Sequence, residues 1–281
     1  MKWKFRHFAA ALAITAPVAV QAEDESARFE LGAFGGVVQD DSEKTGGNDD
    51  GTFGGLASVA FGSDFLVQVD GMLAEHRSDT VAGVALHAGA RVADGGFVGA
   101  YASVSENDRH RGLTVYRLGG QIDFDLGNFS LGSIAGYEDT DSGTFLIRTT
   151  ATDDIFDVYR GRGRFFAASD IRFQPSKMFG ISAGHRLNGG RNAVAAGVVV
   201  GLGENLALFA QGRAGKGDAD ALFIGLRTRF GGSEGGQPLL DNMLMEDLFT
   251  FSSTRRSLAV PLPPPDDDDD DDCGSYGGYC N

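Results

Sequence analysis

The chain has 281 residues and a formal net charge of −15, with 39 Asp and Glu against 24 Lys and Arg. Phosphate binding needs clustered positive charge, so this balance argues against nucleic acid as a partner. The only two cysteines, Cys273 and Cys280, lie near the end, so no disulfide can staple the main body, which must be held together by backbone pairing or burial.

The N-terminal segment predicts a secretory signal peptide over residues 1–22. Basic residues precede an apolar stretch that runs from Phe8 to Val20, and the small residue Ala22 stands before a cleavage site at Glu23. An uncleaved anchor is the alternative, but the stretch is shorter than the about 20 residues that a spanning helix needs. Cleavage changes the net charge to −18.

The segment from Phe29 to Phe230 alternates apolar and polar residues in about twelve short runs. Between Thr80 and Val92, for example, one face is apolar while the other carries small, polar and charged residues. A soluble two-sheet sandwich also alternates but puts its apolar side inward, whereas a sheet in lipid must close on itself. Pro175 is the only proline from residue 23 to 230, which favours continuous strand pairing. The pattern predicts a closed antiparallel transmembrane β-barrel over residues 23–230.

The connections alternate between tight turns, such as residues 201–204, and longer polar stretches, such as residues 187–192. Outer-membrane barrels have short periplasmic turns and longer external loops, so both ends of the barrel segment are expected on the periplasmic side. The count predicts twelve strands. The stretch from Glu138 to Gly163 leaves fourteen open, but its two apolar runs are shorter than the about 9–11 residues of a spanning strand. A hairpin that projects above the membrane or folds into the lumen is therefore favoured.

The last strand carries the most specific signal. One face ends in the aromatic Phe230 after Leu226, and this pattern resembles the terminal-strand signature of Gram-negative outer-membrane, porin-like β-barrel proteins. The resemblance implies residence in outer-membrane lipid and recognition by the barrel assembly machinery, with Leu226 and Phe230 as the assembly signal. The signature usually closes such chains, whereas this chain continues to residue 281.

The strand period assigns polar and charged residues to the lumen. Closure of the barrel brings Arg227 and Arg229 near Glu30. An ion-pair network that fills the lumen and a narrow charge-selective pore both fit this set, and glycines such as Gly54 and Gly184 put little bulk inside, which favours a pore. The pore-lining candidates are Glu30, Asp70, His87, Arg91, Arg117, Asp123, Asp170, Arg172, Arg186, Arg213, Arg227 and Arg229.

No residue is predicted to be catalytic, and no cofactor or metal site is expected. Strand pairing gives the order Ser58, Asp70, His87, which puts the carboxylate between nucleophile and base and so separates serine from histidine. Asp70 and His87 are expected to form a satisfied polar pair. The remaining histidines are not grouped as metal ligands.

Residues 231–281 form an acidic low-complexity tail, predicted to be disordered and periplasmic. A glycine-rich linker precedes a short amphipathic helix after Pro238, and the run Asp266 to Asp272 is expected to be solvated, or to gather divalent cations or a basic periplasmic protein. Cys273 and Cys280 are candidates for a disulfide in the oxidising periplasm.

The sequence thus predicts an outer-membrane porin-like channel for passive diffusion of small polar solutes. Two alternatives stay open. The barrel could be a non-conducting anchor that presents a periplasmic acidic tail, or its loops could bind external ligands.

Overall fold

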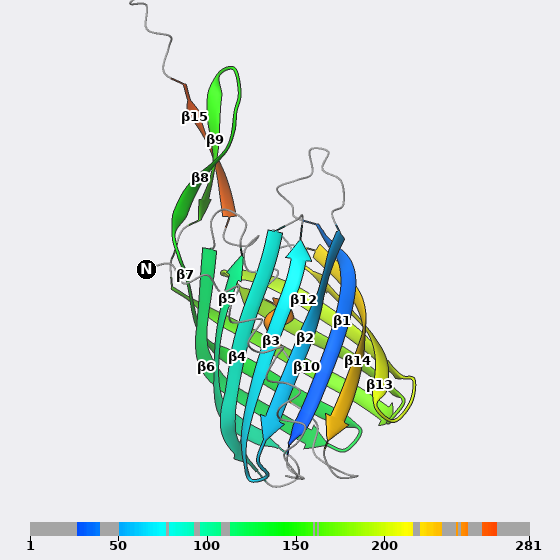
Figure 1. The fold of residues 1–281 in the computed structure, drawn as a ribbon. Helices are drawn as coiled ribbons and strands as arrows, with labels where there is room; N and C mark the ends of the chain where they lie inside the picture. The colour runs from blue at the N-terminus through cyan, green and yellow to red at the C-terminus, as the bar shows by residue number, and fades with distance from the viewer. Residues whose placement is uncertain are drawn as a thin grey trace, which may run out of the picture.

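The fold is taken from a computed structural model, which describes residues 27–39, 51–76, 79–92, 96–107, 113–159, 161, 163–215, 220–231, 240, 243–246 and 255–262. Most of the described chain forms one closed barrel, and a small sheet projects beyond one rim (Figure 1). The signal peptide, the aspartate run and both cysteines lie outside the described residues.

The barrel has twelve antiparallel strands in the order β1-β14-β13-β12-β11-β10-β7-β6-β5-β4-β3-β2. β14 pairs with β1 along its whole length, with Glu30 opposite Arg229, so the sheet has no free edge. The twelve-strand prediction is confirmed. The strands are β1 (Arg28–Gln39), β2 (Gly51–Phe61), β3 (Phe65–His76), β4 (Asp79–Arg91), β5 (Phe97–Asn107), β6 (Leu113–Leu126), β7 (Phe129–Thr140), β10 (Arg164–Ser176), β11 (Phe179–Asn188), β12 (Arg191–Gly201), β13 (Leu206–Ala214) and β14 (Asp220–Gly231).

The outer face of the barrel is a band of large apolar side chains. Phe53, Leu118 and Ile171 are 58%, 67% and 59% exposed on three different strands. Lipid satisfies such a surface while the closed ladder satisfies the backbone. The predicted alternation is confirmed, and charged residues such as Asp70, Arg117 and Arg186 lie on the inner face. No helix among the described residues is long and apolar enough to cross a membrane.

The two ends of the barrel differ in most of their connections, as predicted, although at the loop end β3 and β4 are joined by only two residues. Short turns such as Gly127–Asn128 and residues 177–178 join strands at one end, here called the turn end, where β1 begins and β14 finishes. At the other end, here called the loop end, residues 187–192 were expected to form a longer loop. They form a tight hairpin instead, because Gly189 and Gly190 adopt φ values of 59° and 75°, which a two-residue turn of this type requires.

The stretch between β7 and β10 forms a hairpin outside the barrel. β8 (Gly143–Thr149) pairs with β9 (Asp153–Tyr159), and β7 pairs directly with β10, so neither short strand enters the barrel wall. Of the two arrangements considered for this hairpin, the structure has the projecting one (Figure 1). The fourteen-strand alternative is therefore excluded.

Two described parts of the tail lie away from the turn end. A one-turn 3₁₀ helix, η3 (Met243–Glu246), lies inside the barrel, and a further strand, β15 (Arg255–Pro261), pairs with β9 at the loop end (Figure 1). The lumen supplies partners for η3, and the edge of the β8-β9 hairpin supplies a ladder for β15. The periplasmic location expected for residues 231–281 stays a prediction.

Candidate functional site

The barrel lumen contains an apolar core that the charge pattern did not predict. Phe34, Tyr101, Phe166, Phe209 and Phe223 point inward and are nearly fully buried. They occupy the same face of their strands as the charged lumen residues, so the strand period already assigned them to the interior. Their size was the overlooked signal, because five aromatic rings fill much of a small barrel.

Glycines on the inner face make room for these rings. A Cβ on Gly54 would lie 2.8 Å from the Phe34 ring, and one on Gly225 would lie 2.6 Å from the Phe209 ring. Such contacts are too short for real atoms, so only glycine permits the rings to lie flat on the neighbouring strand. The expectation that inner-face glycines leave the lumen open is therefore wrong at Gly54. At Gly225, too, an aromatic ring takes the space that the missing side chain leaves.

Helix η3 occupies the space between the aromatic rings. Leu244 and Met245 belong to the same apolar cluster and are 0% and 4% exposed. Gly83 of β4 permits this packing, since a Cβ there would lie 3.2 Å from Leu244 Cδ2. One turn of the tail thus plugs the barrel, and its apolar side chains gain the burial that the predicted amphipathic pattern required.

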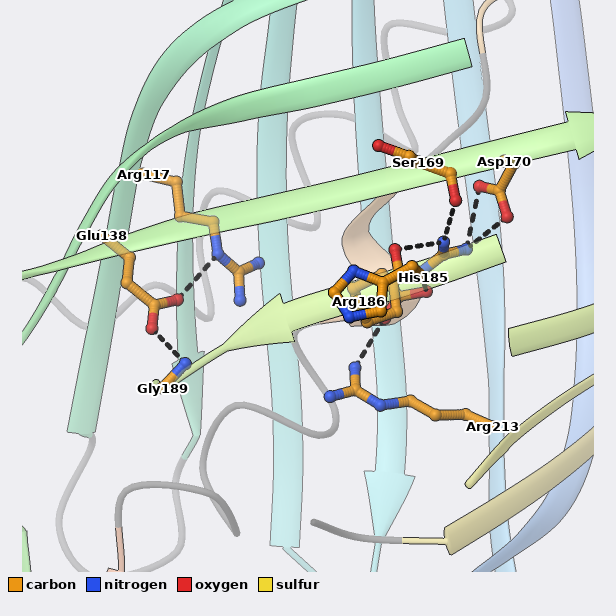
Figure 2. A network of polar contacts seen from close by, with 9 residues as sticks. Arg117, Glu138, Ser169, Asp170, His185, Arg186, Gly189 and Arg213 are labelled. Atoms are coloured by element: carbon orange, nitrogen blue, oxygen red, sulfur yellow. Dashed lines mark hydrogen bonds and ion pairs between the residues drawn. The ribbon is translucent and has the colours of Figure 1, made fainter. Parts of the chain in front are cut away.

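A charged clamp holds the end of η3. Glu246 Oε1 accepts a hydrogen bond from Arg186 Nε at 2.6 Å, and Oε2 accepts one from Arg213 Nη1 at 2.7 Å. Arg186 also donates to both oxygens of Asp170, at 3.0 and 2.9 Å, and to two backbone carbonyls of β10 and β11 (Figure 2). All donor nitrogens of Arg186 are therefore engaged, which fixes the guanidinium that receives the helix.

A second attachment lies nearer the turn end. The side-chain amide of Gln68 donates to the Leu240 carbonyl and accepts from the Leu240 N–H, both at 2.9 Å. The same amide donates to Asp70, which accepts from His87 at 2.8 Å. His87 also contacts Gln121 Oε1 at 2.5 Å, and Gln121 donates to Asp123. A continuous hydrogen-bonded chain therefore links the tail to β3, β4 and β6.

The two ring nitrogens of His87 both have partners. Nε2 lies 2.8 Å from Asp70 Oδ2, and Nδ1 contacts the side chain of Gln121, whose amide nitrogen donates to Asp123. The expected Asp70–His87 pair is confirmed, and Ser58 lies directly opposite Asp70 in the ladder, in the expected order.

A third polar group stabilises the loop end. The Glu138 carboxylate accepts hydrogen bonds from Arg117 Nε, at 3.3 Å, and from the backbone N–H of Gly189 (Figure 2). The Arg117 guanidinium also lies 5.4 Å from the centre of the Phe166 ring. These contacts tie β6 and β7 to the hairpin between β11 and β12. They belong to the wall and the rim, away from the open part of the lumen.

An open cavity of about 370 Å³ reaches from the turn end to η3. Turn residues such as Asn128, Lys177 and Glu204 border it, and Met243, Met245 and Glu246 close it inside. Charges of both signs line it, as expected for a narrow charge-selective pore. Nε and Nη2 of Arg91, a lining residue, have no hydrogen-bond partner among the described residues.

The structure divides the predicted pore residues into two groups. Those that line the cavity are Glu30, Arg91, Asp123, Asp170, Arg172, Arg186, Arg227 and Arg229. Asp70, His87, Arg117 and Arg213 also face inward but are buried in the networks described above. Glu30 pairs with Arg229 at 2.5 Å, as expected from barrel closure. Leu226 and Phe230, the predicted assembly signal, lie on the outer face of β14.

Comparison with known proteins supports the fold. No protein-family model and no curated protein sequence matches the chain. Among solved structures, the KdgM porin, alone and in complex with disordered oligogalacturonate, gives a TM-score of 0.52 at 9% identity, over 72% of this chain and 99% of that one. The fold is that of a Gram-negative outer-membrane β-barrel. An outer-membrane channel from Pseudomonas putida F1 gives a TM-score of 0.46 at 9% identity, over 73% of this chain and 96% of that one.

The outer-membrane barrel offers no cluster of three or more metal-binding side chains within its described residues. Its polar centres are ion pairs and amide contacts that hold the tail or the wall. The cavity at the turn end offers room for a solute within the described lumen.

Proposed function

We propose that this protein is a porin-like channel for small polar solutes whose passage is controlled by its own tail. The observation that carries the proposal is the charged cavity that opens at the turn end and is closed inside by η3. The proposal keeps the passive channel inferred from the sequence and adds a plug to it.

The plug is held by interactions that can be exchanged. Glu246 is a buried carboxylate whose two oxygens bind two arginines. Buried ion pairs cost desolvation and often add little net stability, although loss of one partner is strongly destabilising. A plug fixed in this way stays in place at rest, and a change at the Glu246 carboxylate weakens its attachment.

The cavity has groups suited to a polar solute. Arg172 and Asp123 line the cavity from the strands on either side of β7, near Gly132, so they bring charges of both signs to the same wall. Opposed charges orient dipolar solutes and discriminate between ions of either sign. The cavity therefore supports passage of small hydrophilic molecules better than passage of apolar ones.

The test is single-channel conductance of the full mature chain in planar bilayers, beside a Glu246→Gln variant. The native chain is expected to show brief, infrequent openings, and the variant to spend at least about tenfold more time open, because the arginine clamp is weakened. Glu75→Gln, an exposed glutamate near the end of β3, is the matched control and should behave as the native chain does.

Silence of both the native chain and Glu246→Gln, each shown to be folded, would refute the channel. Steady and equal currents from both would keep the channel but refute control by the tail.

A further inference from the structure

We propose that the barrel carries its own C-terminal segment across the outer membrane and displays the chain beyond Leu262 on the outer face of the cell. This function is independent of whether solutes pass. It follows from the direction in which the described parts of the tail cross the lumen.

The tail enters at the turn end. β14 finishes at Gly231, paired with Arg28 where β1 begins. Leu240 then packs with Ala60, Leu66 and Phe97. These three residues lie at the ends of β2, β3 and β5 that adjoin the tight turns. Leu240 is therefore inside the barrel but close to its turn end.

The next described residues lie deeper. Leu244 contacts the position of Gly83, near the beginning of β4, which adjoins the loop end. Glu246 binds Arg186 and Arg213, which lie in the last third of β11 and β13, again toward the loop end. The chain has thus advanced along the barrel axis between Leu240 and Glu246.

β15 completes the crossing. It pairs antiparallel with β9, with Arg255 opposite Tyr159 and Pro261 opposite Asp153. β9 leads back toward the barrel wall, which it joins through β10, so its Tyr159 end is nearer the rim and its Asp153 end is at the hairpin tip. β15 therefore runs away from the barrel, and the Leu262 N–H donates to the Thr152 carbonyl at the tip at 2.8 Å.

Each stage of this path has its own satisfied partners. Leu240 has both backbone groups bonded to Gln68, Glu246 has both oxygens bonded to arginines, and β15 extends an existing ladder through all seven of its residues. A segment that merely filled space would leave buried polar groups unpaired, at about 1–3 kcal/mol each. The barrel interior and the hairpin edge are both built to receive this segment.

The membrane side follows from barrel architecture. Outer-membrane barrels put their tight turns in the periplasm and their longer connections outside. The turn end therefore faces the periplasm, and the β8-β9-β15 sheet stands outside the cell. The chain that follows Leu262 includes the run Asp266 to Asp272, so the displayed segment is strongly acidic.

The first experiment labels the native cysteines of the full chain in intact cells. Cys273 and Cys280 are reduced and then exposed to a maleimide that bears a polyethylene glycol chain too large to cross the outer membrane. We expect both to be labelled without permeabilisation. Labelling only after permeabilisation would overturn the proposal.

Two matched controls define the sides in a Cys273→Ser, Cys280→Ser background. Thr152→Cys at the exposed hairpin tip should react in intact cells, and Lys177→Cys in the exposed turn between β10 and β11 should react only in permeabilised cells. The native cysteines should be labelled in intact cells, as Thr152→Cys is. If they are labelled only in permeabilised cells, as Lys177→Cys is, the tail lies in the periplasm and the proposal is wrong.

The second experiment traps the pairing of β15 in the same serine background. Ala259 and Ile155 are directly opposite, and the bonded Leu262–Thr152 pair makes them a non-hydrogen-bonded pair, whose Cα atoms lie about 4.5 Å apart. A disulfide fits this spacing. The double variant Ile155→Cys, Ala259→Cys should form a cross-link in membranes, whereas Ile155→Cys, Val260→Cys, which faces the other side, should not. Absence of the first cross-link would overturn the threaded path, whatever the conductance of the chain.

Discussion

The side-chain amide of Gln68 pairs with both backbone polar groups of Leu240, as a neighbouring strand would. Gln68 is fully buried, so neither contact competes with water. A residue of the barrel wall thereby supplies a single rung of ladder to a segment 172 positions later in the chain.

Replacement of Gln68 by leucine removes this rung. The Leu240 N–H and carbonyl would be left without partners, and so would one oxygen of Asp70, at about 1–3 kcal/mol for each buried group. We expect faster hydrogen exchange at residues 240–246 with unchanged exchange in β10 and β11. Equal exchange of the tail in both proteins would contradict the role of Gln68.

Replacement of Leu244 by alanine tests the apolar part of the plug. The side chain is fully buried against the inward rings, and such truncations cost about 2–5 kcal/mol. Added protease should cleave the tail of the variant far faster than the tail of the native chain. Leu258→Ala, on the exposed face of β15, is the control and should leave the protease pattern unchanged.

Arg172 and Arg117 should differ in their effect on ion selectivity. Arg172 lines the cavity, whereas Arg117 is buried against Phe166 and Glu138. In the Glu246→Gln background, Arg172→Ala should shift the reversal potential toward cation selectivity, because a positive charge leaves the passage. Arg117→Ala should not shift it. A shift with Arg117→Ala and none with Arg172→Ala would show that ions pass on the side of the lumen that carries Arg117.

His87→Phe tests the hydrogen-bonded chain across the wall. Loss of the imidazole leaves Asp70 and Gln121 without their common partner, so we expect the temperature of barrel unfolding to fall. His185→Phe removes one exposed contact to Asn192 and should have little effect. Gel mobility of heated and unheated samples, which separates folded from unfolded barrels, measures both.

The alternation of apolar and polar residues predicted which side chains of the barrel strands face inward, because a strand residue can point to only two faces. Glu30 and Arg229 could be matched from alternation and closure alone, and their ion pair forms as expected. Gly54 was assigned to the inside by the same rule, and Phe34 has the inward parity of Glu30. Their contact was missed because alternation fixes the face of a residue but not how far its side chain reaches across to the next strand.

The path of the tail could not be predicted in the same way. A glycine-rich linker after Gly231 carries no direction, so the position of the last strand suggested the nearer compartment. The decisive partners of Glu246, Arg186 and Arg213, are 60 and 33 positions away. The apolar residues Leu240, Met243 and Leu244, in a segment predicted to be a short amphipathic helix, were the local sign that this part of the tail has a fixed place.

Closure of β14 on β1 has a mechanical consequence for the segment it encloses. The wall is a ring of twelve strands, and on the path proposed above the tail passes through this ring. A segment enclosed in this way can leave the lumen only by sliding along the barrel axis, and the part beyond Leu262 would pass through the lumen last. A stably folded domain fused after Leu262 would block this movement, so that η3 could shift within the lumen but could not leave it while the barrel stayed intact.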